Sequence, residues 1–180
     1  MKLWITRHGQ TDYNKMKIMQ GAINIPLNET GRAQAEEVRD KLKDISFDAV
    51  IASPMDRAVE TASIITGLSK DDIIKDKRIR EFGFGKFENV EYSKMGPAMT
   101  LYWVLPELFP CPKTVETIPA ATKRIKSFVE DLRTKDYENV LIVCHGGIIR
   151  VLSGVLEGRK NNIKWRPKPV NCEVREYELR

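Results

Sequence analysis

Residues 140–147, VLIVCHGG, form the most strand-like run in the chain and end in a histidine and two glycines. Five consecutive apolar residues are typical of a strand that is buried on both faces, as the central strands of parallel sheets are. Ligands of such sheets bind beyond the carboxyl ends of the strands. The stretch therefore predicts both a layered fold and the edge of it where the chemistry lies.

Further strand-like segments stand on either side of this run. We expect a first strand over 2–6, a buried strand over 47–52, a weaker strand over 73–78 and an edge strand over 173–179. The glycine-rich residues 82–87 are interpreted as a loop.

Helical periodicity fills the intervals between the strands. Asn28 is a plausible N-cap for a helix that runs through Leu42, and Ser53 is expected to cap a helix with Pro54 in its first turn and an end near Gly67. A long amphipathic helix is predicted from residue 118 to 132, and residues 92–112 are expected to form a short helix and a covering loop. Alternating strands and helices indicate an α/β domain with a mostly parallel sheet.

Composition fits a single domain over residues 1–180. The chain is 42% hydrophobic and 31% charged, and no apolar run approaches the roughly 18 residues that cross a bilayer. Met1 leads directly into the first strand, so we expect no signal peptide. Three cysteines without a paired spacing predict reduced thiols and a cytoplasmic location.

The net charge of +5 favours anionic partners. A basic patch without acidic residues surrounds Trp165 and consists of Arg159, Lys160, Lys164, Arg166 and Lys168. Stacking of Trp165 on a nucleic-acid base is one interpretation. We favour the other, a solvated loop that borders an anion-binding pocket. The expected partner is thus a small phosphorylated metabolite, with no nucleic acid and no membrane, and a homodimer stays possible.

Both histidines of the chain, His8 and His145, fall at the predicted ligand-binding edge. A neutral His8 could attack phosphorus directly if its other ring nitrogen donates to a backbone carbonyl. Arg7 and Arg57 could bind phosphate oxygens in bidentate fashion, and a protonated His145 would add a third positive group. This set predicts phosphoryl transfer, which requires a positioned nucleophile and charge stabilisation.

The leaving alkoxide needs a proton, and Glu81 is the best candidate to supply it. Glu81 follows the weak third strand and precedes the glycine-rich loop. Gly9, Gly146 and Gly147 would allow backbone amides to approach a phosphate closely.

Together these segments resemble the histidine phosphatase (phosphoglycerate mutase-like) superfamily from end to end. The matching residues are Arg7-His8-Gly9-Gln10-Thr11, Asn14, Gln20-Gly21, Pro26-Leu27, Gly31, Gln34-Ala35, Ser53-Pro54, Arg57-Ala58, Thr61-Ala62, Glu81, Gly85, Phe87-Glu88 and His145-Gly146-Gly147. Asn89 stands where many relatives have glycine, so the resemblance does not fix the path of that loop.

The resemblance implies a three-layer α/β/α sandwich, no metal and no cofactor. It implies a phosphohistidine on His8, with Glu81 as the proton donor. The remaining implied site residues form a phosphate pocket and a substrate-facing wall: Arg7, Asn14, Arg57 and His145 in the pocket, and Gln20, Gly21 and Gly146 on the wall.

Within that superfamily the sequence favours a phosphatase over a phosphoglycerate mutase. The cofactor-dependent mutases are longer and carry a basic insertion, whereas residues 95–109 here contain no lysine or arginine. We expect hydrolysis of a small phosphomonoester by an enzyme like α-ribazole-phosphate phosphatase or one of broad specificity. The mutase remains the alternative, and a non-catalytic phospholigand-binding protein is a third, weaker hypothesis.

Overall fold

The computed structural model describes residues 1–106 and 108–179; Glu107, in the predicted covering segment, and Arg180, in the predicted single domain, lie outside the described residues. The sheet has five strands in the order β3-β2-β4-β1-β5. Their bounds are β1 Lys2–Arg7, β2 Ala49–Ala52, β3 Ile74–Lys75, β4 Asn139–Cys144 and β5 Val174–Glu178. The pairs β1–β4, β2–β4 and β2–β3 are parallel, and β5 is antiparallel to β1 at the edge. The predicted mostly parallel sheet and its edge strand are confirmed.

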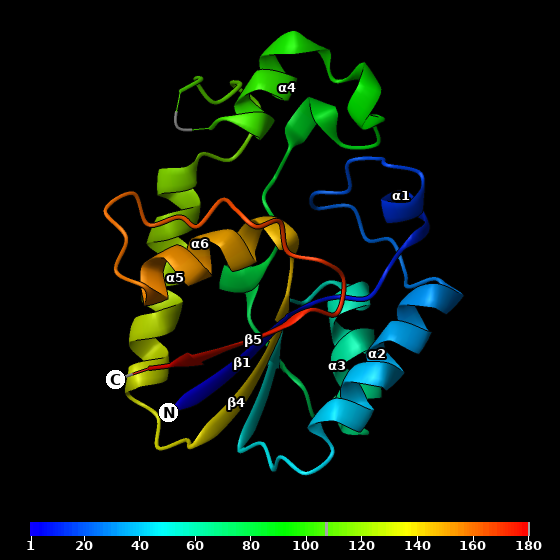
Figure 1. Cartoon of the computed structure of the whole chain (residues 1–180), viewed down its shortest axis with the longest axis vertical. Helices are drawn as coiled ribbons and strands as arrows, with labels where there is room; N and C mark the ends of the chain where they lie inside the picture. The colour runs from blue at the N-terminus through cyan, green and yellow to red at the C-terminus, as the bar shows by residue number, and fades with distance from the viewer. Residues whose placement is uncertain (107, 180) are drawn as a thin grey trace.

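Helices cover both faces of the sheet (Figure 1). Helices α2 (Glu29–Leu42) and α3 (Asp56–Thr66) pack on one face, where Trp4 and Leu141 project into their core. Helices α5 (Ile118–Arg133) and α6 (Gly146–Leu156) pack on the other, against Ile5 and Ile142. Successive residues of β1 and β4 thus point into opposite cores, as expected for buried central strands. The three-layer α/β/α sandwich is confirmed.

Two predicted helix boundaries are also confirmed. The Asn28 side chain accepts a hydrogen bond from the Gly31 amide at 2.9 Å, an N-cap worth about 1 kcal/mol. Helix α3 ends at Gly67, whose φ of 74° lies in the left-handed region that glycine adopts without a steric penalty.

The predicted start of α3 is wrong. Helix α3 begins at Asp56 after an N-cap residue, Met55, that makes no side-chain cap hydrogen bond, so Pro54 precedes the helix. The hydroxyl of Ser53 lies 2.7 Å from a ring nitrogen of His145. The same hydroxyl accepts only a long hydrogen bond, 3.5 Å, from the amide of Met55, which precedes the first helical residue, so Ser53 does not cap the helix.

The third strand is shorter than predicted. Strand β3 contains only Ile74–Lys75, and the end of the predicted strand 73–78 forms a 3₁₀ turn instead, η1 (Lys77–Ile79). The side chain of Asp76 accepts from the Arg78 amide at 2.7 Å and caps this turn. That local bond competes with continuation of the strand.

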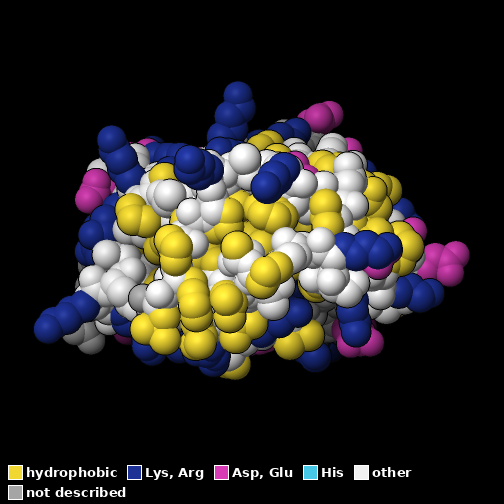
Figure 2. All heavy atoms as spheres, turned by 90° about the horizontal axis from the view of Figure 1, so that it is seen from above, with side chains coloured by type: hydrophobic (Ala, Val, Ile, Leu, Met, Phe, Trp, Pro, Cys, Tyr) yellow, Lys and Arg dark blue, Asp and Glu magenta, His cyan; other side chains and the backbone are white. Residues whose placement is uncertain are grey.

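Above the sheet lie the covering segments. They comprise α1 (Asp12–Lys15), the 3₁₀ turns η2 (Gly85–Phe87) and η3 (Tyr92–Lys94), and α4 (Gly96–Val104). Hydrophobic side chains gather on the face seen from above (Figure 2). In and just after α4, the hydrophobic residues Leu101, Val104 and Leu108 are exposed. The predicted short helix and cover are confirmed.

Two findings bear on the cellular setting. Within 1–106 and 108–179, no helix combines the length and apolar character needed to cross a membrane. The three cysteines, Cys111, Cys144 and Cys172, carry free thiols. The cytoplasmic location stays a prediction.

Candidate active site

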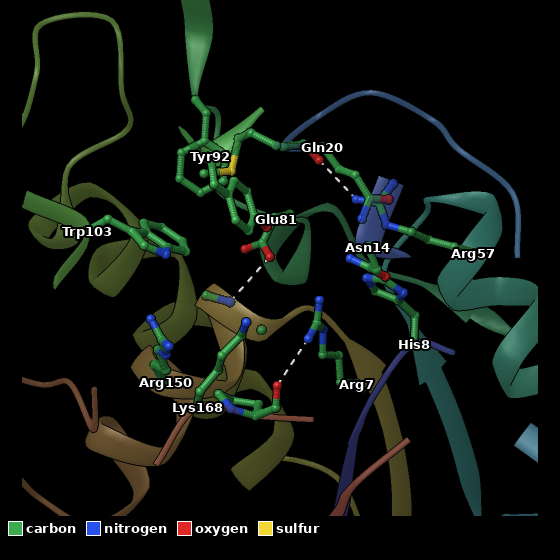
Figure 3. A pocket seen from close by; sticks show the side chains of 16 residues that line it. Arg7, His8, Asn14, Gln20, Arg57, Glu81, Tyr92, Trp103, Arg150 and Lys168 are labelled. Carbon is green, nitrogen blue, oxygen red and sulfur yellow. Dashed lines mark hydrogen bonds between the residues drawn. The ribbon is translucent and has the colours of Figure 1, made fainter. Parts of the chain in front are cut away.

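A cavity opens at the carboxyl ends of the parallel strands. His8 follows β1, and its amide donates to the carbonyl of Cys144 at the end of β4 at 3.0 Å. His145 follows β4 directly, so neighbouring strands bring the two rings together with centroids 5.2 Å apart. Figure 3 shows the side chains that converge here from separate parts of the chain. The site therefore lies at the predicted edge.

The His8 ring is fixed as the sequence predicts. Its side chain is 2 % exposed, and Nδ1 lies 2.7 Å from the carbonyl oxygen of Gly9. Burial first, and then the charges of Arg57 and Arg7, hold the pKa of His8 well below its ordinary value. A neutral ring that donates from Nδ1 keeps the lone pair of Nε2 available for attack.

His145 is fully buried beside His8. Its Nε2 lies 2.7 Å from Ser53 Oγ, and its Nδ1 has no hydrogen-bond partner within the described part of the chain. Burial, with the charges of Arg57, His8 and Arg7, lowers the pKa of His145 well below its usual value. Burial and the neighbouring positive charges thus disfavour an imidazolium at this position, and protonation of His145 beside a bound phosphate stays a prediction. A neutral ring that accepts from the Ser53 hydroxyl can still donate from Nδ1.

Two buried arginines frame the cavity. Arg57 is 1 % exposed and donates from Nη1 to Ile23 O at 2.7 Å and from Nη2 to Gly21 O at 2.9 Å. Arg7 donates from Nη1 to Pro169 O at 3.1 Å. In both residues the buried Nε has no partner among the residues described. Burial lowers the pKa of Arg57 to about 10, so its guanidinium stays charged at neutral pH.

Asn14 lies in the short helix α1, and hydrogen bonds orient its amide. The oxygen Oδ1 accepts from the Thr11 amide at 3.2 Å and from Asn171 Nδ2 at 3.3 Å. Asn171 Nδ2 also donates to His8 O at 2.8 Å and thereby links Asn14 to the nucleophile. With its oxygen engaged twice, Asn14 can present its NH₂ group to an anion.

Gln20 and Gly21 form a wall of the cavity beside Arg57. Glu88 holds this wall, since its Oε1 accepts from the amides of Ala22 and Phe84, each at 3.0 Å. The φ of Gly21 is 54°, and a Cβ there would lie 2.3 Å from Glu88 Oε1. Position 21 thus requires glycine.

Glu81 is the one carboxylate among the described residues that line the cavity. Its Oε1 accepts from the Phe82 amide at 3.0 Å, and its Oε2 accepts from the Gly147 amide at 3.3 Å. These bonds place the carboxyl group over the start of α6, where Figure 3 shows it facing Arg7 across the cavity. Glu81 is therefore positioned to exchange a proton with a bound ligand.

A Gly147→Ala substitution is expected to displace Glu81. The new Cβ would lie 2.6 Å from Glu81 Oε1 and 2.7 Å from Phe82 Cδ2, both too close. We expect a fall in kcat/KM of about 10- to 100-fold, the effect of a displacement near 1 Å. Steady-state hydrolysis of an alkyl phosphate measures it.

Gly83→Ala is the matched control, because a Cβ at residue 83 meets nothing within 4 Å. It should keep wild-type kinetics. Wild-type activity of the Gly147→Ala protein would contradict the proposed placement of Glu81.

The structure brings the predicted site residues together. All of the predicted catalytic and substrate-binding residues line the cavity except His145, which lies buried against His8: Arg7, His8, Asn14, Gln20, Gly21, Arg57, Glu81 and Gly146. The expected approach of the Gly9 amide to a phosphate is wrong, because this amide donates to Thr61 Oγ1 at 3.0 Å. Asn89 departs from the family pattern without disturbing the loop. Its φ of 64° is one that asparagine tolerates, and its Oδ1 accepts from the Tyr13 hydroxyl at 2.8 Å.

Several lining residues were missed by the sequence interpretation. They are Met19, Phe84, Tyr92, Trp103, Arg150 and Pro169. Lys168 was noted only as part of the basic patch. A signal for Arg150 was present, because it is a charged residue inside the otherwise apolar helix that follows His145-Gly146-Gly147.

Comparison with known proteins identifies relatives of the chain. The sequence model described as the histidine phosphatase superfamily (branch 1) matches residues 3–180. A putative phosphoserine phosphatase 2 of Hydrogenobacter thermophilus is 31% identical, over 99% of this chain and 89% of that protein. An adenosylcobalamin/alpha-ribazole phosphatase of Escherichia coli is 28% identical, over 92% of this chain and 83% of that protein.

A solved structure is also similar to this chain over most of its length. YhfR of Bacillus stearothermophilus superimposes with a TM-score of 0.87 at 30% identity, covering 98% of this chain and 90% of that one.

Proposed function

The chain belongs to the histidine phosphatase superfamily, and from this premise we propose that it hydrolyses small phosphomonoesters through a phosphohistidine on His8. The observation that carries the proposal is the bond between His8 Nδ1 and Gly9 O at 2.7 Å. This bond fixes the tautomer in which Nε2 is the nucleophile.

In the first step Nε2 of His8 attacks phosphorus and the bond from phosphorus to the ester oxygen breaks. Glu81 gives its proton to the departing alkoxide, which leaves as an alcohol. The two hydrogen bonds to the Glu81 carboxyl keep it at the cavity wall while the proton is transferred.

In the second step a water molecule attacks the phosphohistidine. Glu81, now a carboxylate, takes a proton from the water, the bond from phosphorus to nitrogen breaks, and inorganic phosphate leaves. His8 returns to its neutral form and Glu81 to its acid form.

The protein's own groups stabilise the charge on the phosphoryl oxygens. Arg7 and Arg57 supply two guanidinium groups, of which that of Arg57 is buried, and Asn14 and His145 supply N–H donors. Preorganised donors of this kind stabilise a developing charge strongly because they need not reorient during the reaction. Their number supports a metal-independent reaction.

The reaction class can be tested with a panel of phosphomonoesters in EDTA. We expect free phosphate from p-nitrophenyl phosphate, α-ribazole 5′-phosphate and O-phosphoserine, at rates that EDTA does not lower. The latter two esters correspond to the names of the relatives, and equal rates would indicate broad specificity. Absence of turnover, or turnover that requires added metal, would contradict the proposal.

A phosphoglycerate mutase remains the second candidate. The cover over the cavity favours hydrolysis, since residues 95–109 supply no basic side chain. Incubation with 3-phosphoglycerate and 2,3-bisphosphoglycerate separates the two. Formation of 2-phosphoglycerate would show a mutase, and release of phosphate alone would show a phosphatase.

A further inference from the structure

Arg150 is a buried cation that the proposed mechanism does not use. It lies in α6, its side chain is 6 % exposed, and it lines the same cavity as His8. Its Nε and Nη1 make no hydrogen bond to any of the described residues. Burial of an unpaired charged group is costly, so such a group in a cavity indicates an anionic ligand.

Two tryptophans hold the Arg150 guanidinium in place. Its central carbon lies 4.0 Å from the ring centroid of Trp165 and 5.6 Å from that of Trp103. Trp165 Nε1 in turn donates to Trp103 O at 3.2 Å, which fixes the two indoles relative to each other. Contact with an indole covers a face of a guanidinium and leaves its in-plane N–H groups able to bind an anion.

Lys168 adds a second cation to this side of the cavity. It lies on the loop whose Pro169 carbonyl accepts from Arg7. Burial, and then the charges of Arg7 and Arg150, lowers the pKa of Lys168. Burial likewise lowers the pKa of Arg150, to about 10. Desolvation is the first cause of both shifts, although Lys168 is exposed overall, and a bound anion would offset it.

The arrangement places Arg150 and Lys168 apart from the group of residues around His8. Figure 3 shows Arg150 and Lys168 on the side of Trp103, and His8, Asn14 and Arg57 on the opposite side. A phosphoryl group at His8 would therefore leave the first group free to contact the rest of the substrate. A leaving group with a neutral base, as in α-ribazole 5′-phosphate, offers no charge to it.

We propose that Arg150 and Lys168 form a second anion subsite, so that the preferred substrates are phosphomonoesters whose leaving group carries a carboxylate or a second phosphate. This inference rests on the proposed function, because the first anion is the phosphoryl group at His8. The planar fork of Arg150 suits either oxyanion.

Matched pairs of esters test the subsite. Phosphoglycolate and ethyl phosphate differ by a carboxylate, and fructose 1,6-bisphosphate and fructose 6-phosphate differ by a phosphate. We expect the wild-type protein to prefer the acidic member of at least one pair by about tenfold or more in kcat/KM, the effect of a charge-assisted hydrogen bond. The pair that shows the preference identifies the second anion.

Variants then assign the preference to the subsite. Arg150→Met keeps an unbranched side chain against the two indoles and should reduce the preference toward unity, chiefly through KM of the acidic substrate. Arg150→Lys should restore part of it. Lys168→Met should weaken the preference without altering the buried region. Lys160→Met, which removes an exposed charge from the same basic patch but does not line the cavity, should retain it.

Binding gives a readout that does not depend on turnover. Phosphoglycolate added to the His8→Ala protein should change the tryptophan fluorescence, since its carboxylate would contact the cation held by Trp103 and Trp165, and ethyl phosphate should change it less. Two results would overturn the subsite. The first is equal kcat/KM of the wild-type protein for the two esters of each pair. The second is an equal loss of kcat/KM for the acidic and the neutral ester in the Arg150→Met and Lys168→Met proteins, which would indicate that Arg150 is structural. Failure to hydrolyse any ester would instead overturn the proposed function.

Discussion

The His8→Ala protein is expected to lose phosphatase activity by about 10⁴-fold or more, the scale seen when a nucleophile is removed from an enzyme. It should also fail to take up label from a ³²P-labelled phosphomonoester, because no ring nitrogen remains at that position to form the phosphoenzyme. Acid-labile, base-stable label on the wild-type protein in a rapid-quench experiment measures the intermediate directly.

Two controls accompany this substitution. Far-ultraviolet circular dichroism should show an unchanged secondary structure, since the backbone bond from the residue 8 amide to Cys144 O does not involve the side chain. Gly83→Ala should label like the wild-type protein. Retained label in the His8→Ala protein would place the nucleophile elsewhere.

The Glu81→Gln protein is expected to show different losses for different leaving groups. With an alkyl phosphate, formation of the phosphoenzyme should slow by about 10²- to 10⁴-fold, the usual contribution of a general acid. With p-nitrophenyl phosphate the loss in this step should be much smaller, because p-nitrophenolate leaves without a proton. Glutamine keeps the size of the side chain and one of the two oxygens that accept backbone amides, so the variant loses one of the bonds that hold residue 81.

The second half-reaction provides an independent check on Glu81. Without a carboxylate to take a proton from water, the phosphohistidine formed from p-nitrophenyl phosphate should persist. A burst of nitrophenolate equal to the enzyme concentration, followed by slow turnover, is the expected time course. Equal losses for alkyl and aryl esters in the burst phase would rule out Glu81 as the acid.

Local signals predicted much of the fold. The apolar run 140–144 could only be a buried strand or a short piece of helix, and the glycines after it favoured the strand. Asn28 and Gly67 marked helix ends because their roles depend on a few neighbouring backbone atoms. Long-range contacts decided where prediction failed: Ser53 binds His145, which lies 92 residues away in the chain, rather than the helix beside it.

The site shows the same division between local and long-range information. His8, Glu81 and His145 could be recognised because each follows a predicted strand. Arg150 stood out in the sequence as a charged residue in an apolar helix, but its contacts with Trp103 and Trp165, which place it at the cavity, join distant parts of the chain. Asn171 gave no signal, since its contacts with His8 and Asn14 join distant parts of the chain.

The two bonds from Arg57 to the carbonyls of Gly21 and Ile23 have a consequence for turnover. They form when the protein folds, so the entropy of ordering this guanidinium is lost before any substrate binds. A phosphate pocket that is ordered before substrate binds also binds inorganic phosphate, the product released at the end of the reaction. Inorganic phosphate should accordingly act as a competitive inhibitor, and its release would limit kcat.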